Sequence, residues 1–164
     1  MKILFGRTPH GLSRLHPAAI ISTWWWSGLL PWAPGTWGSL FTLPFAWIIA
    51  DRWGGSYLLF AAFITLIGGL WASRVFLDKT TVKDPSIIVI DESVGQFLTL
   101  AFLPVEIWWY IAGFILFRIT DITKPWPASW VDRELNGPAA IMLDDIIAAI
   151  YAAIILQIII TIIG

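Results

Sequence analysis

The stretch that decides the fold runs from Arg118 to Asp145 and reads RITDITKPWPASWVDRELNGPAAIMLDD. It carries three basic residues and five of the eleven acidic residues of the chain, and it lies between two strongly apolar segments. Both flanking segments read as membrane spans. A dense group of charges at such a place is costly unless its members are paired, bound to a metal or solvated. The pattern therefore indicates a functional site within a membrane protein.

The composition supports a membrane protein with one domain, residues 1–164. Hydrophobic residues make up 58% of the chain and charged residues 13%, whereas a soluble domain carries about 25% charge. The formal net charge of −1 excludes a strongly basic nucleic-acid binder, so no nucleic-acid partner is expected. The chain has no cysteine, which excludes disulfides, thiolate zinc sites and a cysteine nucleophile.

The apolar segments predict an all-α fold, a polytopic helical membrane bundle of about five spans. Glycines and prolines interrupt the first apolar run, so residues 17–30 are predicted to form an interfacial or re-entrant segment. The predicted spans are residues 37–50, 55–73, a segment that contains Asp91 and ends near Pro104, 107–117 and 138–163. On the last span, Ala148, Ala149, Ala152 and Ala153 form a small-residue face that favours close packing against a neighbouring helix.

The distribution of Lys and Arg predicts the orientation of these spans. Basic residues concentrate in segments 1–14, 74–86 and 118–137, which places them on the cytoplasmic side. The loops at 51–54 and 103–106 then face away. This topology brings the unusual polar residues of four separate segments to the cytoplasmic ends of the helices, and it predicts a site on the cytoplasmic face.

Five carboxylates would converge there, and they are candidate catalytic residues and metal ligands: Asp91, Glu92, Asp121, Asp144 and Asp145. Like charges in a low dielectric cannot all stay ionised and unpaired. Mg²⁺ or Ca²⁺ would compensate them, since hard cations prefer oxygen ligands. The lack of cysteine and of a nearby histidine argues against zinc. The alternative is that these acids pair with basic residues and only tie helices together, although adjacent acids suit simple ion pairs poorly.

Basic residues in the same region are candidates for phosphate binding. Arg118, Asp121 and Lys124 are spaced three apart and share one helical face. Arginine binds phosphate as a bidentate fork and lysine as a point charge. Arg133 follows two tryptophans, so this segment suits the headgroup level of a membrane. The alternative is that these cations are membrane anchors without a ligand.

The segment Pro34–Ser39, PGTWGS, is a candidate anion-binding loop. Gly35 and Gly38 allow backbone N–H groups to approach an anion, and Thr36 and Ser39 can donate hydroxyl hydrogen bonds at a helix N-terminus. An ordinary helix cap after a proline turn has a similar pattern.

Together these groups favour hydrolysis of a phospholipid phosphate ester by metal-activated water, with a cation stabilising the developing charge. An aspartyl nucleophile remains possible. Other functions stay open: a membrane ion or proton relay, a related phospholipid phosphatase or head-group transferase with another lipid substrate, and a helical scaffold that binds anionic lipid.

Four motifs carry a resemblance to a known family. They are SGLLPWAPGTWGS (27–39), IDESVGQ (90–96), FRITDITKPWPASWVDR (117–133) and IMLDDIIAA (141–149). In this order the chain resembles the bacterial phosphatidylglycerophosphatase A family, over most of its length. The combination FRxxDxxKPWP with IMxDD is the most specific part of the match.

The resemblance implies a Mg²⁺-dependent phosphatase of the bacterial inner membrane that converts phosphatidylglycerophosphate to phosphatidylglycerol. By motif position, Asp91 and Glu92 match the first acidic pair of the family, and Asp144 and Asp145 the last. Two departures stand out. Gln96-Phe97 stands where the family tends to have a Met-Trp pair. Residues 136–140 stand where the family tends to have a glycine-rich loop that contains a histidine. The acids and cations of the motifs are all present.

Overall fold

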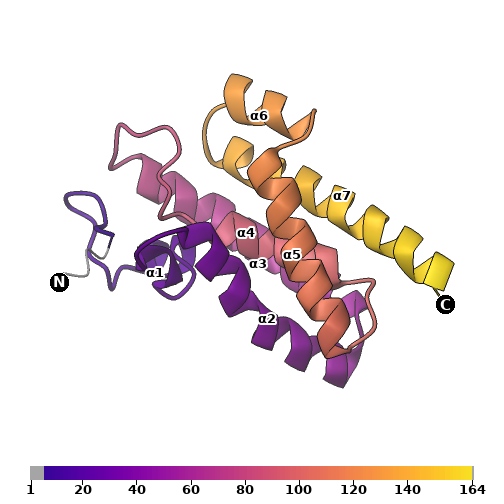
Figure 1. Cartoon of the computed structure of the whole chain (residues 1–164). Helices are drawn as coiled ribbons and strands as arrows, with labels where there is room; N and C mark the ends of the chain where they lie inside the picture. Colours follow the sequence, from indigo (N-terminus) through magenta and orange to yellow (C-terminus); the bar gives the residue numbers. More distant parts are fainter. Residues whose placement is uncertain (1–5, 164) are drawn as a thin grey trace.

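The computed structural model describes residues 6–163, so the first five residues of the predicted cytoplasmic segment 1–14 lie outside the described part. Within residues 6–163 the fold is all-helical and contains no strand, as predicted (Figure 1). The elements are α1 (Pro17–Ser22), the 3₁₀ turn η1 (Ser27–Leu29), α2 (Pro34–Trp53), α3 (Ser56–Leu77), α4 (Ile90–Leu100), α5 (Ile107–Thr123), α6 (Ala128–Glu134) and α7 (Pro138–Ile163).

Helix α4 is the centre of the bundle. It packs against α2, α3, α5 and α7, and most of its side chains are buried. Gly95 makes the contact with α5 and α7 possible, because a Cβ atom there would overlap the ring of Phe117 and would lie 3.2 Å from the carbonyl oxygen of Asp145. The short central helix therefore holds the ends of its longer neighbours close together.

Helix α7 has two distinct faces. Ala148, Ala149 and Ala152 are buried and cluster with Phe117 of α5, which confirms that the small-residue face packs closely. Ala153, the fourth predicted member of this face, is only half-buried. The opposite face exposes an isoleucine at every fourth position: Ile150, Ile154, Ile158 and Ile162. One face thus joins the bundle, and the other presents hydrocarbon to the surroundings.

The helix order matches the predicted spans, but five spans are not confirmed. Among residues 6–163, two helices are long and apolar enough to cross a membrane, residues 56–77 and 138–162. The other three predicted spans are not among these two helices. Helix α2 has 20 residues with Pro44 inside it, and α4 and α5 have 11 and 17 residues. The predicted loop at 51–54 is also shorter, because α2 continues to Trp53 and ends only at Gly54.

The segment predicted to be interfacial or re-entrant, residues 17–30, forms α1, η1 and a sharp turn between them. Three consecutive tryptophans in this turn, Trp24, Trp25 and Trp26, have φ angles of 44°, 55° and 66°. The segment is fixed to the bundle, since α1 packs against α3 and the Val89 N–H donates to the Ser22 carbonyl at 2.8 Å. In Figure 1 it lies beside the start of α2.

Candidate active site

A cavity of about 370 Å³ opens where the ends of α2, α4, α5 and α7 meet. We call it the active-site cavity. Side chains from four helices and from the loop before α4 line it. The residues predicted from the sequence that line this cavity are Thr36, Asp91, Glu92, Arg118, Asp121, Lys124, Asp144 and Asp145.

Three of the acids form a group that we call the carboxylate cluster: Asp91, Glu92 and Asp145. One oxygen of each lies within 4.8 Å of one oxygen of the others. Asp91 and Glu92 occupy the first turn of α4, where the helix dipole favours negative charge. Asp91 Oδ1, Glu92 Oε2 and Asp145 Oδ2 are buried and have no hydrogen-bond partner. Unpartnered carboxylate oxygens at this spacing fit a hard divalent cation.

Arg118 projects from α5 between the carboxylate cluster and α2. Its Nη1 lies 2.7 Å from Asp121 Oδ2 and donates to Ser39 Oγ at 3.4 Å. The same atom is 3.9 Å from Glu92 Oε1. Its Nε is buried and has no hydrogen-bond partner among the described residues. Asp121 therefore contacts Arg118 and adjoins the carboxylate cluster in the same cavity.

Lys124 is held between two carboxylates. It caps α5 in the left-handed conformation, with a φ of 43°, because Pro125 cannot continue the helix. Its Nζ lies 2.6 Å from Asp132 Oδ1 and 2.6 Å from Asp144 Oδ2. Burial alone would lower the pKa of Lys124, but the hydrogen bonds with Asp132 and Asp144 raise this pKa above its ordinary value. We call this arrangement the lysine ion pairs.

The PGTWGS segment forms the first turn of α2, with Pro34 as its first residue. Gly35 lies directly against the carboxylate cluster, since a Cβ atom there would overlap Glu92 Oε1. Thr36 lines the cavity. Ser39 lies deeper, where its Oγ donates to the Gly35 carbonyl at 3.1 Å and accepts from Arg118. Ser39 thus supports Arg118 and does not line the cavity itself.

Arg133 is the predicted residue that lies away from the cavity. It is exposed on α6, and its Nε donates to the Ser129 carbonyl at 3.0 Å. Two residues that were not singled out in the sequence do reach the site. Asp132 binds Lys124, and Asp84 lines the cavity from the loop before α4. Partial desolvation raises the pKa of Asp84, and the Lys124 ammonium opposes this rise.

The sequence signals for the two missed residues were weak. Asp132 lies inside the FRITDITKPWPASWVDR motif, eight residues after Lys124, which was a usable hint. Asp84 lies in a charged loop with no periodicity, and nothing in the sequence separates it from the solvated charges around it.

Comparisons with known proteins identify the family of this chain. The family model described as "Phosphatidylglycerophosphatase A" matches residues 20–160. The Escherichia coli protein "Phosphatidylglycerophosphatase A" is 38% identical over 148 residues, covering 87% of this chain and 83% of the relative. The Haemophilus influenzae protein of that name is 40% identical over 146 residues, covering 88% and 89%.

A third relative, from Bacteroides thetaiotaomicron, bears the name "Putative phosphatidylinositol-3-phosphatase". It is 34% identical over 154 residues, covering 85% of this chain and 91% of the relative. No solved structure matches the chain. The family model spans most of the chain and contains every residue of the active-site cavity named above, so this chain belongs to the phosphatidylglycerophosphatase A family.

Proposed function

We propose that this protein is a membrane lipid phosphatase that hydrolyses the terminal phosphate of phosphatidylglycerophosphate. The products are phosphatidylglycerol and inorganic phosphate. One observation carries the proposal: a cavity of about 370 Å³ contains both a carboxylate cluster with unpartnered oxygens and two cations held in place by other acids. The names of two relatives, each 38–40% identical over most of the chain, supply the substrate.

We also propose that the helices form a multi-pass bundle in the bacterial inner membrane, with the cavity at the cytoplasmic face. Large apolar side chains are exposed along α2, α3, α5 and α7, as a lipid environment would favour. Examples are Phe45, Phe60, Ile115 and Ile154. The basic segments 74–86 and 118–137 adjoin the cavity end of the bundle, which supports the orientation.

The phosphate monoester is proposed to bind between Arg118 and Lys124. Arg118 lines the cavity with its side chain, and Asp121 holds Nη1 of the guanidinium at 2.7 Å. The N–H groups of Thr36 and Trp37 donate to the Ala33 carbonyl, so the first turn of α2 adds the Gly35 N–H and the Thr36 hydroxyl, at the positive end of the helix dipole. The raised pKa keeps Lys124 protonated, so this residue suits charge neutralisation better than proton transfer.

The carboxylate cluster is proposed to hold Mg²⁺. Asp91, Glu92 and Asp145 would be its protein ligands, while Asp121 and Asp144 hold the cations. When bound, Mg²⁺ would supply a Lewis acid that favours ionisation of water and neutralises phosphate charge. In hydrolysis a bond forms from the water oxygen to phosphorus, the ester P–O bond breaks, and the glycerol oxygen leaves as a hydroxyl. A carboxylate in the cavity accepts the proton that the water loses, and this proton passes to the departing glycerol oxygen.

The test uses purified protein with phosphatidylglycerophosphate, with Mg²⁺ or with a chelator. Released phosphate is measured, and the product lipid is identified by mass. We expect phosphatidylglycerol to form only with Mg²⁺. The Asp145→Asn variant is the control for a contaminating phosphatase. Folded protein that releases no phosphate in either condition would end the proposal.

A second substrate has support from the Bacteroides relative and its name. Phosphatidylinositol 3-phosphate is therefore assayed in parallel, at matched concentration in the same vesicles. Both lipids carry a phosphate monoester, so the same cavity chemistry applies to each. The ratio of the two kcat/KM values decides between them, and we expect it to favour phosphatidylglycerophosphate.

A further inference from the structure

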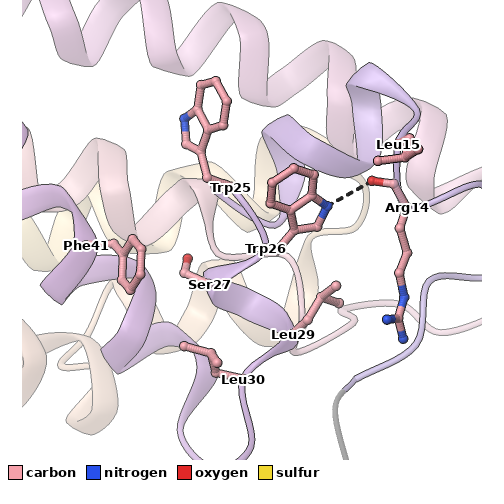
Figure 2. A pocket seen from close by; sticks show the side chains of 8 residues that line it. All are labelled: Arg14, Leu15, Trp25, Trp26, Ser27, Leu29, Leu30 and Phe41. Carbon is pink, nitrogen blue, oxygen red and sulfur yellow. Dashed lines mark hydrogen bonds between the residues drawn. The ribbon is translucent and has the colours of Figure 1, made fainter.

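A second cavity, of about 460 Å³, lies beside the N-terminal segment (Figure 2). We call it the tryptophan cavity. Its side chains come from the segment before α1, from the turn around η1 and from α2, and they surround one opening. Apolar residues predominate in the lining, and Arg14 is its charged member. The argument uses Leu15, Trp25, Trp26, Leu30 and Phe41.

The walls of this cavity expose an unusual amount of apolar surface. Leu15 is 75% exposed, Trp25 58% and Phe41 42%. In the N-terminal interfacial segment, where side chains meet water at the headgroup level, each Å² of apolar surface removed from water contributes about 25 cal/mol. An apolar ligand that covers three such side chains would therefore bind favourably, and the shape is a concave pocket of the kind that binds small molecules.

The turn that forms one wall of the tryptophan cavity has a strained backbone. Trp24, Trp25 and Trp26 all have positive φ angles, which cost about 1–3 kcal/mol per residue outside glycine. A hydrogen bond fixes the turn, since Trp26 Nε1 donates to the Arg14 carbonyl at 2.9 Å (Figure 2). Strain of this kind concentrates at ligand-binding sites. Its presence in the wall of an open apolar cavity indicates a function for that cavity.

The tryptophan cavity adjoins the active-site cavity along one segment of chain. Leu29 and Leu30 line the tryptophan cavity, and residues 33–36 line the active-site cavity. Pro34 lines the active-site cavity, and Phe41 follows it by seven residues, so the two lie on the same face of α2 about 10 Å apart along the helix axis. A single ligand with a polar end and a long apolar part can therefore reach from one cavity into the other.

We propose that the tryptophan cavity binds an acyl chain of the lipid whose phosphate monoester occupies the active-site cavity. This inference rests on the proposed function and extends it to how the substrate is recognised. The apolar walls match a hydrocarbon chain. Recognition of the acyl chain would make the enzyme select a lipid over its free headgroup.

The first test compares two substrates, phosphatidylglycerophosphate and the same headgroup without acyl chains. The measured ratio is kcat/KM for the lipid divided by kcat/KM for the free headgroup. Trp25→Ala is expected to lower this ratio about tenfold, because it removes a cavity wall that touches only the acyl chain of the lipid. Phe41→Ala, on a regular helix, should lower the ratio in the same direction and guards against misfolding in the strained turn. Trp53→Ala is the matched control, since Trp53 is 56% exposed and lies outside both cavities. A ratio unchanged in both cavity variants overturns the inference.

The second test does not depend on activity. Phosphatidylcholine vesicles carry phosphatidic acid with a photoreactive diazirine near the end of one acyl chain, and the adducts are mapped by mass spectrometry. Adducts on residues 14–30 and 37–41 should exceed those at the exposed Phe60 and Phe63 of α3. Unlabelled phosphatidic acid should reduce the cavity adducts and leave the α3 adducts unchanged.

The outcomes separate the two proposals. Competed cavity adducts in a protein without phosphatase activity would retain the lipid site and remove the proposed function. An active enzyme whose adducts spread evenly over all lipid-facing helices would overturn the acyl-chain site. Cavity adducts that the competitor does not reduce would also overturn it, because they would come from a lipid other than the substrate class.

Discussion

The carboxylate cluster and the lysine ion pairs share one cavity but differ in how their charge is compensated. In the lysine ion pairs, one ammonium lies 2.6 Å from each of two carboxylates. In the carboxylate cluster, three acids lie together with unpartnered oxygens, and the recorded cation contact, from Arg118 to Glu92, is long at 3.9 Å. Lys124 compensates its two acids at short range, although Asp144 Oδ1 is buried without a partner among the described residues, whereas the carboxylate cluster has only the long contact with Arg118 there.

The difference teaches that neighbouring acids in one sequence motif can have opposite roles. Asp144 and Asp145 are adjacent on α7, yet Asp144 holds Lys124 and Asp145 joins the cluster. A buried acid without a cation destabilises the metal-free protein, whereas a buried acid in an ion pair cannot be removed without leaving a charge unpaired. The same Asp→Asn change should therefore have opposite effects on stability at these two positions.

The largest effect is expected for Asp145→Asn. Loss of one carboxylate from the cluster should lower kcat/KM by at least about a hundredfold and abolish the rise in thermal midpoint on adding Mg²⁺. In the metal-free protein the midpoint should rise, because like charges no longer face each other. Activity assays and thermal unfolding with and without Mg²⁺ measure both.

The matched control is Asp144→Asn on the next residue. Because Lys124 loses one partner, this variant should lower the unfolding free energy by about 1–3 kcal/mol. The thermal midpoint should therefore fall both with and without Mg²⁺. If both variants shifted the metal-free midpoint in the same direction, the contrast between the two halves of the site would be wrong.

The next effect concerns Arg118, which lies between the two halves. Arg118→Lys keeps the positive charge but removes the planar guanidinium. In the wild-type protein this group contacts Asp121 through Nη1, and its Nε has no partner among the described residues. We expect kcat/KM to fall roughly tenfold to a hundredfold while the Mg²⁺-induced shift in thermal midpoint persists. A variant that lost the Mg²⁺ response as well would place Arg118 in the metal site instead of the phosphate site.

The sequence predicted which segments meet but not which acid pairs with which cation. Positive-inside topology placed motifs from α2, α4, α5 and α7 at one end, and the cavity brings their charged side chains together. The pairing depends on side-chain direction. Arg133 follows Asp132 directly, but successive residues on a helix point about 100° apart, so Asp132 faces Lys124 and Arg133 faces solvent.

Other parts of the structure depend on tertiary contacts that periodicity does not reveal. Asp84 reaches the cavity from a loop that Lys83 fastens to α6, where its Nζ donates to the Asp132 and Arg133 carbonyls at 3.0 Å each. The end of α2 was predicted too early because Asp51 and Arg52 resemble a loop, although no helix breaker occurs between Asp51 and Gly54. Charge alone does not end a helix.

An intermediate effect is expected where the helices behind the cluster approach. Gly95→Ala should lower the unfolding free energy by about 1–3 kcal/mol, because the new methyl group would overlap Phe117 and push α5 from α4. Gly68→Ala is the control, since a Cβ there meets its nearest neighbour at 3.9 Å, and it should be neutral or stabilising. Equal stability of the two variants would show that close packing at Gly95 does not position the cluster.

The smallest effect is expected for Asp132, the partner of Lys124 that sequence reasoning missed. Its side chain is 37% exposed, so Asp132→Asn should change the unfolding free energy by less than about 1 kcal/mol. The remaining Asp144 contact keeps Lys124 charged but no longer fixes it from two sides, so we expect KM to rise up to about tenfold with kcat nearly constant. Asp78→Asn, which removes an exposed pair with Arg74, controls for loss of a surface charge. A fall in kcat with unchanged KM would instead mean that Lys124 acts mainly on the transition state, and the lysine ion pairs would then contribute to the chemical step and not to ground-state binding.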